Sequence, residues 1–402
     1  MESTVQTILN CIKYEICGDE GQKERKKVVL SEGSVRFLTE LYKFSKAHDV
    51  AHLVGDALSK CGAFNNLPDT IEENECATIE KIKAKFDEQV FTAVYRYENI
   101  NYELGQIKHT FNEAKIPFIP LKGSVIRKFY PEPWMRTSCD IDILVKESDV
   151  DNASKILAER LQYTIDEKWQ HDISLFSSSD IHVELHFKLI DTGFKQVDGL
   201  IDILNSGEIE PVSGYEYCMS NELFLLYHIY HMAKHFVHGG CGIKPFIDLW
   251  VIQNKIGYDE EKAEKLMKEN DLLLFYNHAM ELMAVWFEGK PHNSVTQEME
   301  NYILQGGVYG TLEQKLAMSQ NKKGGKFRHL LSKIFLSYEQ MKVYYPSVKK
   351  CPILFPFYQV RRWVRILFCG GRKTAMNEIK ANQKLSDEKK QIAKKMIDEL
   401  GL

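Results

Sequence analysis

The sequence predicts an α+β protein in which a small β-sheet core lies between a helical N-terminal region and a helical C-terminal domain. Apolar residues recur at helical spacing before residue 115 and again from about residue 221, whereas the residues between alternate with a period of two. The 402 residues are 44% hydrophobic and 27% charged, which is ordinary for a globular protein with two or three cores. We therefore expect four parts, which are residues 1–115, 116–190, 191–320 and 321–402.

The first part, residues 1–115, contains one proline, Pro68, and its apolar residues follow helical spacing. A long helix is predicted from about Ala77 to Ala114. We find no residues with evident chemistry in this part, so we expect it to pack against the core or to shape the substrate side.

The chain then enters Leu121–Val145, which carries two elements of interest. Ile116–Leu121 is a short apolar strand that leads into Lys122-Gly123-Ser124, and residues 124–130 can open a short helix. The free N–H groups of a helix start can face a phosphate, and Gly123 would allow a close approach. Lys122 or Arg136 would add positive charge.

Asp140 and Asp142 lie two apart in a predicted strand, so their side chains share one face. Cys139, Ile141, Ile143 and Val145 are expected on the opposite, buried face. Two carboxylates this close repel each other unless a cation lies between them. The pair therefore favours a hard divalent metal ion.

Two further strands are predicted at His171–Ser177 and Ile181–Leu189. In the second, His182, Glu184 and His186 alternate with apolar residues and so form one polar face. A zinc site built from these three residues is a less favoured alternative, because a set of acids with Asp140 and Asp142 suits Mg²⁺ or Mn²⁺ better.

A helix is predicted from about Asn221, and it ends before Gly239-Gly240 and Gly242. His231 and His235 are four apart, so they lie on one helix face close to Lys234. From chemistry alone, such a pair is a hydrogen-bonded structural feature or, less often, a zinc site.

These motifs together resemble the nucleotidyltransferase superfamily of the DNA polymerase β type, whose pattern is a hydrophobic-Gly-(Gly/Ser) element followed by Asp-hydrophobic-(Asp/Glu). More narrowly, the chain resembles the bacterial family of uncharacterised nucleotidyltransferases. Its members carry Leu-Lys-Gly, Tyr-Pro, Arg and Asp-Ile-Asp, then His-x-x-x-His, a glycine-rich break and an Asp. Here these motifs are Leu121–Gly123, Tyr130-Pro131, Arg136, Asp140–Val145, His231, His235, Gly239–Gly242 and Asp248.

The resemblance implies a small mixed β-sheet nucleotidyltransferase core and a reaction that moves a nucleoside monophosphate from an NTP to an acceptor hydroxyl or phosphate, with release of pyrophosphate. Glu184 is then the third carboxylate beside the aspartates, and these three residues would be catalytic and would hold Mg²⁺ (or Mn²⁺). The nucleotide-binding residues would be Lys122, Gly123, Ser124, Arg136, His231, Lys234 and His235.

The net charge is only −4, but it is unevenly distributed. Between Asn321 and Lys373 there are thirteen Lys and Arg against one acid, Glu339, so this segment carries about +12 and the remainder about −16. Interleaved aromatic residues and cations can bind nucleic acid or an anionic membrane surface. Pro346, Pro352 and Pro356 argue against one long amphipathic helix, so a basic surface wrapped around the acidic body remains the alternative.

Nine cysteines show no metal-type spacing, and no apolar run is long enough to span a membrane. From the polar start Met1–Val5 we expect no signal peptide. We expect a cytoplasmic protein with reduced thiols, with a peripheral membrane contact left open. Two other functions also stay open. A non-catalytic nucleotide-binding scaffold would show no turnover, and a metal-dependent phosphohydrolase would depend on His231 and His235 and release inorganic phosphate.

Overall fold

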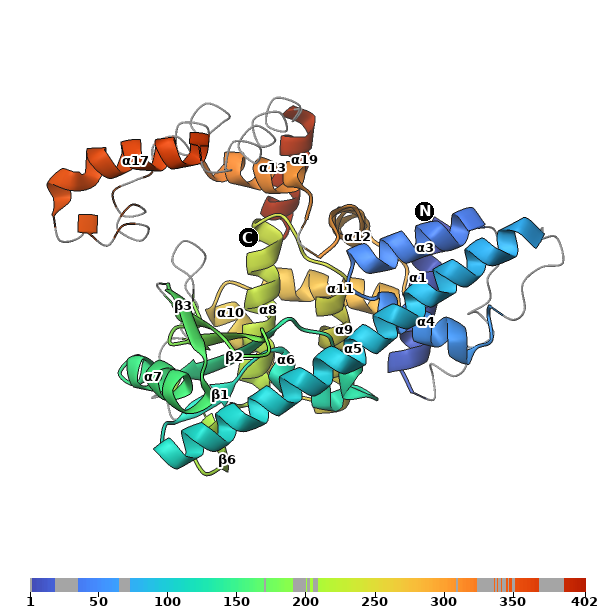
Figure 1. The fold of residues 1–402 in the computed structure, drawn as a ribbon. Helices are drawn as coiled ribbons and strands as arrows, with labels where there is room; N and C mark the ends of the chain where they lie inside the picture. The colour runs from blue at the N-terminus through green and yellow to red at the C-terminus, as the bar shows by residue number, and fades with distance from the viewer. Residues whose placement is uncertain are drawn as a thin grey trace.

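The α+β prediction is confirmed by the computed structural model, in which a mixed sheet lies against helices from both halves of the chain (Figure 1). The structure describes residues 2–18, 35–64, 73–169, 171–190, 200, 203–204, 209–308, 310–323, 351–368 and 387–402, with single positions between 336 and 348. Within these ranges, no helix is both long and apolar enough to cross a membrane.

The N-terminal region forms helices α1 (Glu2–Ile16), α3 (Val35–Ala47), α4 (Ala51–Lys60) and α5 (Glu73–Ala114), as the apolar spacing predicts. Helix α5 has 42 residues and so is about 63 Å long. It runs diagonally across the molecule, from the other N-terminal helices to the sheet (Figure 1). This helix therefore joins the two parts of the fold.

The sheet has seven strands in the order β3-β4-β5-β2-β1-β7-β6. The central strand β2 (Asp140–Val145) pairs in parallel with β5 (His182–His186) and antiparallel with β1 (Phe118–Pro120). Strands β3 (Thr164–Lys168) and β4 (Asp172–Phe176) continue the sheet beyond β5, while β7 (Glu216–Met219) and β6 (Ile209–Ser213) extend it beyond β1.

One face of the sheet packs on a compact apolar cluster with the C-terminal half of α5 and with α7 (Val150–Leu161). Ile141, Ile143 and Val145 of β2 are fully buried there, because alternate residues of a strand point to the same side. The acidic residues of β2 and β5 consequently point to the opposite side of the sheet.

The C-terminal helices are α8 (Asn221–Val237), α9 (Lys244–Val251), α10 (Glu260–Glu269), α11 (Leu273–Glu288), α12 (Ser294–Gly306), α13 (Leu312–Lys323), α17 (Phe355–Phe368) and α19 (Asp387–Glu399). Residues of α8, α9, α11 and α12 share one large apolar cluster with α1, α3, α4 and the N-terminal half of α5. Helices from the two ends of the chain are thus packed on each other.

Three strands were not predicted from the sequence. Strand β3 is polar and lies at one edge of the sheet. Strands β6 and β7 lie within residues 191–320, which were expected to be helical. Strand β6 is the other edge, and four of its five residues are exposed, so it lacks the buried alternation that reveals a strand.

The basic segment 321–373 lies largely outside the described residues. Its described part includes a 3-10 turn at Pro352–Leu354 and then α17, which has Pro356 in its first turn. Of the three prolines that argued against one long amphipathic helix, Pro352 and Pro356 each stand at a helix start, where a missing N–H group costs nothing, and Pro346 lies outside the described residues.

Candidate active site

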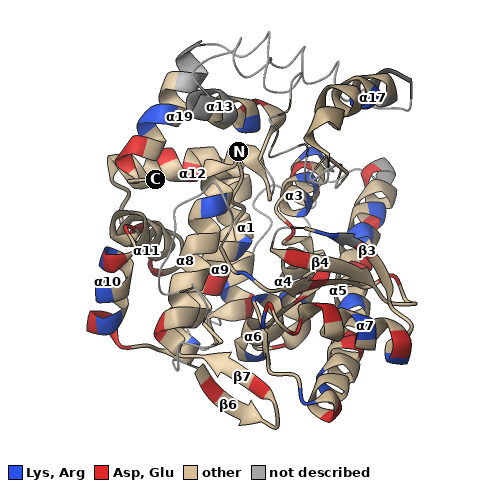
Figure 2. Cartoon of the chain, turned by 90° about the vertical axis from the view of Figure 1, so that its left-hand side faces the viewer, with Lys and Arg blue, Asp and Glu red and all other residues tan. Residues whose placement is uncertain are grey.

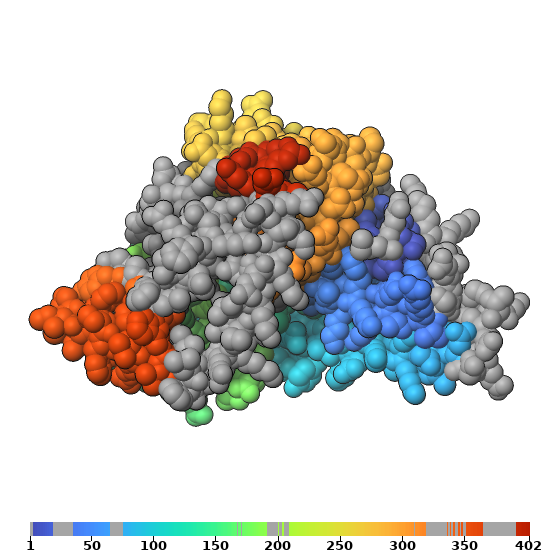
Figure 3. Space-filling model, turned by 90° about the horizontal axis from the view of Figure 1, so that it is seen from above, coloured from blue at the N-terminus to red at the C-terminus, as the bar shows by residue number. Residues whose placement is uncertain are grey.

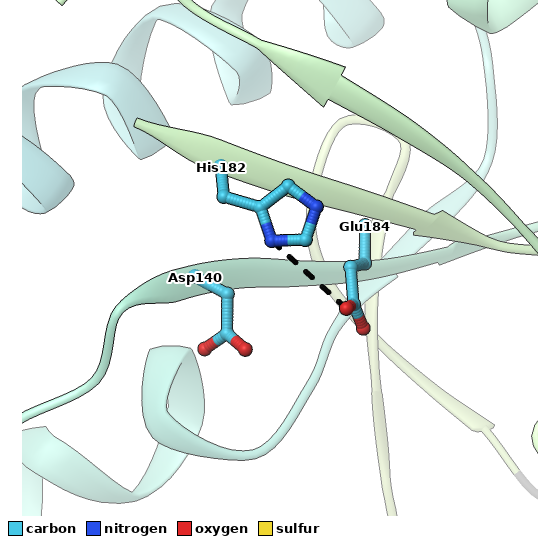
Figure 4. A group of neighbouring side chains, drawn as sticks. All are labelled: Asp140, His182 and Glu184. Carbon is cyan, nitrogen blue, oxygen red and sulfur yellow. Dashed lines mark ion pairs between the residues drawn. The ribbon is translucent and has the colours of Figure 1, made fainter. Parts of the chain in front are cut away.

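The two central strands bring the predicted acids together. In the parallel register of β2 and β5, Asp140 lies opposite His182 and Asp142 lies opposite Glu184. The side chains of Asp140, His182 and Glu184 project from their strands into the same space (Figure 4). Side chains alternate along both strands, and the strands pair in parallel. These two features together bring the carboxylates of Asp140, Asp142 and Glu184 to one place.

Asp142 is the most enclosed of these acids, with a 3% exposed side chain. Its Oδ1 accepts hydrogen bonds from Lys122 Nζ at 2.7 Å and from His186 Nε2 at 2.9 Å. His186 Nε2 also lies 3.2 Å from Glu184 Oε2. Two basic groups thus supply positive charge to this cluster, with His186 between Asp142 and Glu184 and Lys122 at Asp142.

These contacts set the protonation states of the cluster. Although burial opposes it, the charges of Lys122 and His186 hold the pKa of Asp142 well below its usual range. The Asp142 and Glu184 carboxylates in turn raise the pKa of the buried His186 to about 9. Burial and the neighbouring Asp142 charge raise the pKa of Asp140. At neutral pH, His186 is therefore protonated and Asp142 is ionised.

Lys122 reaches Asp142 from an unusual backbone conformation. Its φ of 45° and ψ of −121° correspond to the first central position of a type II′ turn, which glycine normally occupies. A residue with a Cβ atom is strained in this region by about 1–3 kcal/mol. The strain indicates that the surrounding structure holds the amine against Asp142.

A cavity of about 790 Å³ opens over this face of the sheet. Its lining includes nine of the ten predicted site residues, which are Lys122, Gly123, Arg136, Asp140, Asp142, Glu184, His231, Lys234 and His235. The cavity is large enough to hold a nucleotide together with part of a second substrate.

Helix α8 provides another wall of this cavity. His231 and His235 lie one turn apart, as predicted, and their Nε2 atoms are 3.1 Å from each other. Burial and the nearby Lys122 charge hold the pKa of His231 well below its usual range. His231 is therefore neutral at physiological pH and offers the cavity a hydrogen bond rather than a charge.

Arg136, which was predicted to bind nucleotide, forms an ion pair with Asp248 that was not predicted from the sequence. Its Nε atom donates to both oxygens of Asp248 in α9, at 2.7 and 2.9 Å, and Tyr130 donates to Asp248 Oδ1 at 2.6 Å. Asp248 is the one acid in the helix KPFIDLWV and stands among apolar residues, which is a signal of a buried partner.

The N-terminal helices hold the segment that leads into β2. Asp49 accepts hydrogen bonds from Lys244 Nζ and from Thr137 Oγ1, and the second distance is 2.9 Å. His52 Nε2 lies 2.8 Å from the Met135 carbonyl oxygen. Since a carbonyl can only accept, His52 donates this hydrogen bond, and the segment is fixed from two sides.

Two residues, Ser124 and Cys139, do not lie where we predicted them from the sequence. Ser124 is absent from the cavity lining, and its backbone N–H donates to the Leu121 carbonyl within its own turn. Cys139 is exposed rather than buried, because β2 begins one residue later and the alternation does not reach it. Only Gly123 of the Gly-Ser pair therefore faces the cavity.

The donor atoms can hold a divalent ion in two overlapping ways. Among the described residues, the oxygen and nitrogen atoms of Asp140, His182 and Glu184 lie within 4.8 Å of one another, and so do those of Asp142, Glu184 and His186. The alternative zinc triad of His182, Glu184 and His186 does not gather around one point. Residues 182 and 186 are about 13 Å apart along a strand.

No curated protein matches the chain. Among solved structures, the solution structure of the antibiotic-resistance factor ANT(2'')-Ia has a TM-score of 0.26 and 11% identity, over 48% of this chain and 93% of that chain. The sequence model of the uncharacterised nucleotidyltransferases matches residues 38–288, which is more than half of the chain. This chain therefore belongs to the family of uncharacterised nucleotidyltransferases.

Proposed function

We propose that the protein transfers a nucleoside monophosphate from an NTP to a hydroxyl or phosphate group of an acceptor, with release of pyrophosphate, in a reaction that requires Mg²⁺ or Mn²⁺. The observation that carries this proposal is the convergence of Asp140, Asp142 and Glu184 from two parallel strands at the floor of a large cavity. Family membership sets the class of reaction.

The residues present fit a divalent cation, because carboxylate oxygens and imidazole nitrogens converge within 4.8 Å of one another, although the ion would have to displace the Lys122 amine from Asp142. Asp140, Asp142 and Glu184 would hold the ion, with His182 as a nitrogen ligand within reach. When bound, Mg²⁺ or Mn²⁺ stabilises the negative charge that develops on the transferred phosphoryl group and on the leaving pyrophosphate.

The protein's own groups orient the two substrates. The acceptor oxygen attacks the α-phosphorus of the NTP, the bond from this phosphorus to the bridging oxygen breaks, and pyrophosphate leaves. Glu184 accepts the proton of the acceptor hydroxyl. Lys122, Lys234 and Gly123 contact phosphate oxygens, and the neutral His231 with His235 contributes hydrogen bonds from α8. Arg136, held by Asp248, ties α9 to the segment before β2.

The first test is calorimetric titration of each NTP, with Mg²⁺ or Mn²⁺ present and absent, into the wild type and the Asp140→Asn/Asp142→Asn variant. We expect binding that requires metal and is lost in the variant. Asp166→Asn is the matched control, since Asp166 is an exposed strand acid on β3 and should leave binding unchanged. Binding that ignores both metal and the two aspartates would refute the proposal.

The released product distinguishes this function from phosphate hydrolysis. A nucleotidyltransferase releases pyrophosphate in amounts equal to the nucleotide joined to the acceptor, whereas a phosphohydrolase releases inorganic phosphate without an acceptor. Replacement of both His231 and His235 by Gln should weaken nucleotide binding and leave the product unchanged. Release of inorganic phosphate that depends on these histidines and not on Asp140 would favour the hydrolase.

A further inference from the structure

Helix α17 projects from one end of the molecule (Figures 1 and 3). One of its sides is anchored to the segment that precedes it. Gln359, which is 5% exposed, donates from Nε2 to the Leu336 carbonyl at 2.6 Å. The ring of Tyr358 stacks on Tyr345, with centroids 4.7 Å apart. The helix therefore presents a definite outer face.

That outer face is apolar. Ile353, Phe357, Val360 and Val364 are 86%, 64%, 52% and 50% exposed, respectively. Their spacing of four, three and four residues places all four on one face of the helix and the turn before it. We call these four residues the α17 stripe. Single exposed apolar residues are common on protein surfaces, but a continuous stripe of large ones marks an interaction site.

The charge of α17 indicates which partner fits. The sequence FPFYQVRRWVRILF contains Arg361, Arg362 and Arg365 and no acid, and Figure 2 shows basic but no acidic residues in this helix. Arg361 lies beside the α17 stripe, roughly 40° around the helix from Phe357 at 100° per residue. Arginines beside an apolar face match a bilayer, whose headgroups carry phosphate above an apolar interior.

A nucleic acid fits this face less well. Bases stack on aromatic rings, and the backbone binds cations. The α17 stripe has one aromatic ring and three aliphatic side chains, and aliphatic side chains gain little from a polyanion in water. The face is therefore suited to lipid.

We infer that α17 lies in the plane of a membrane surface that contains anionic lipids, with the α17 stripe inserted among the acyl chains and Arg361 paired with lipid phosphates. No helix among the described residues could span the bilayer, so this contact is peripheral. It would keep the cavity close to the membrane, whichever group the enzyme transfers, and it does not depend on the proposed function.

The test is co-sedimentation of the full chain with vesicles of phosphatidylcholine, with and without phosphatidylglycerol, at low and high salt. We expect binding that requires phosphatidylglycerol and persists in part at high salt, because apolar insertion is not screened. Phe357→Glu should lower the vesicle partition coefficient about tenfold or more, since it replaces a ring that inserts among the acyl chains by a charge. Phe357→Leu should restore most of the binding.

The matched control is Phe91→Glu, since Phe91 of α5 is 71% exposed and lies outside the α17 stripe. It should bind vesicles as the wild type does. Should Phe357→Glu perturb folding, as judged by circular dichroism and by NTP binding, Ile353→Glu in the preceding turn gives the same comparison. Three results would overturn the inference. These are equal vesicle binding by Phe357→Glu and Phe91→Glu, vesicle binding that high salt alone abolishes, and binding to RNA or DNA but not to vesicles.

Discussion

Lys122 allows the electrostatics and the backbone strain of the site to be measured separately, by comparing Lys122→Ala with Lys122→Gly. Both variants remove the amine that lies 2.7 Å from Asp142 Oδ1. Breaking a buried ion pair on one side typically costs 3–5 kcal/mol. His186 remains as a partner of Asp142, so we expect Lys122→Ala to lose about 3 kcal/mol.

Lys122→Gly differs from Lys122→Ala in the backbone alone. At a φ of 45° and a ψ of −121°, glycine relieves strain of roughly 2 kcal/mol, but it adds about 0.7 kcal/mol of unfolded-state entropy. We therefore expect Lys122→Gly to be about 1 kcal/mol more stable than Lys122→Ala. Urea unfolding followed by circular dichroism, with chelator present, measures both differences. Lys128→Ala is the control, since Lys128 is an exposed lysine in the next turn, and it should stay within about 0.5 kcal/mol of the wild type.

Metal adds an independent readout. In both Lys122 variants a divalent ion no longer has to displace the amine, so Mn²⁺ should raise the unfolding midpoint of the variants by more than that of the wild type. A Lys122→Gly variant no more stable than Lys122→Ala would refute the strain argument. A Lys122→Ala variant as stable as the wild type would refute the ion-pair argument.

Three further predictions follow from other contacts. Asp248→Asn should cost about 3–5 kcal/mol in urea unfolding, because it leaves the buried Arg136 charge without its carboxylate. The double variant Arg136→Met/Asp248→Asn should lose clearly less than the sum of its two single variants, so additive losses would contradict this reasoning. Burial lowers the pKa of His52 to about 4, so between pH 6.5 and 4 the unfolded chain binds a proton that the folded chain does not. The free energy of unfolding should therefore fall as the pH is lowered through this range, by at most about 3 kcal/mol from this residue, and His52→Gln should reduce the slope by up to one proton. A slope unchanged in this variant would show that His52 titrates normally. Finally, His182→Ala should weaken Mn²⁺ binding about tenfold and Mg²⁺ binding less, as measured by calorimetry, since an imidazole nitrogen is a better ligand for Mn²⁺. Equal losses for the two ions would exclude His182 as a ligand.

The sequence predicts those parts of the fold that have a strong hydrophobic period. Strands β2 and β5 and helix α8 alternate or repeat clearly, and each is observed close to its predicted bounds. Strand β6 contains Pro211 and is exposed along most of its length, so its pairing depends on the neighbouring β7 rather than on its own pattern. Edge strands of this kind are specified by tertiary contacts.

The residues of the candidate site also fall into those that the sequence predicts and those that it does not. That Asp140 and Asp142 share a face follows from local alternation, whereas the place of Glu184 on a neighbouring strand was implied by the family resemblance. The partners of these acids do not follow from local rules. Arg136 and Asp248 are 112 residues apart in the chain. The positive φ of Lys122 could not be predicted either, because the neighbouring Gly123 is the residue that normally adopts such a conformation. Ser124 was assigned to phosphate because the motif suggested it, whereas its N–H group closes its own turn.

The N-terminal helices, which carry no candidate site motif, determine where strand β2 lies. Helix α5 contributes Phe86 to the large helical cluster and Phe111 to the cluster beneath the sheet, so it fixes the two clusters relative to each other. Asp49 and His52 then hold Thr137 and Met135, only three and five residues before Asp140. A shift of α3 or α4 would therefore move the start of β2 while the apolar face of the sheet stays packed. This connection explains why the family resemblance extends to residue 38, far upstream of the carboxylates.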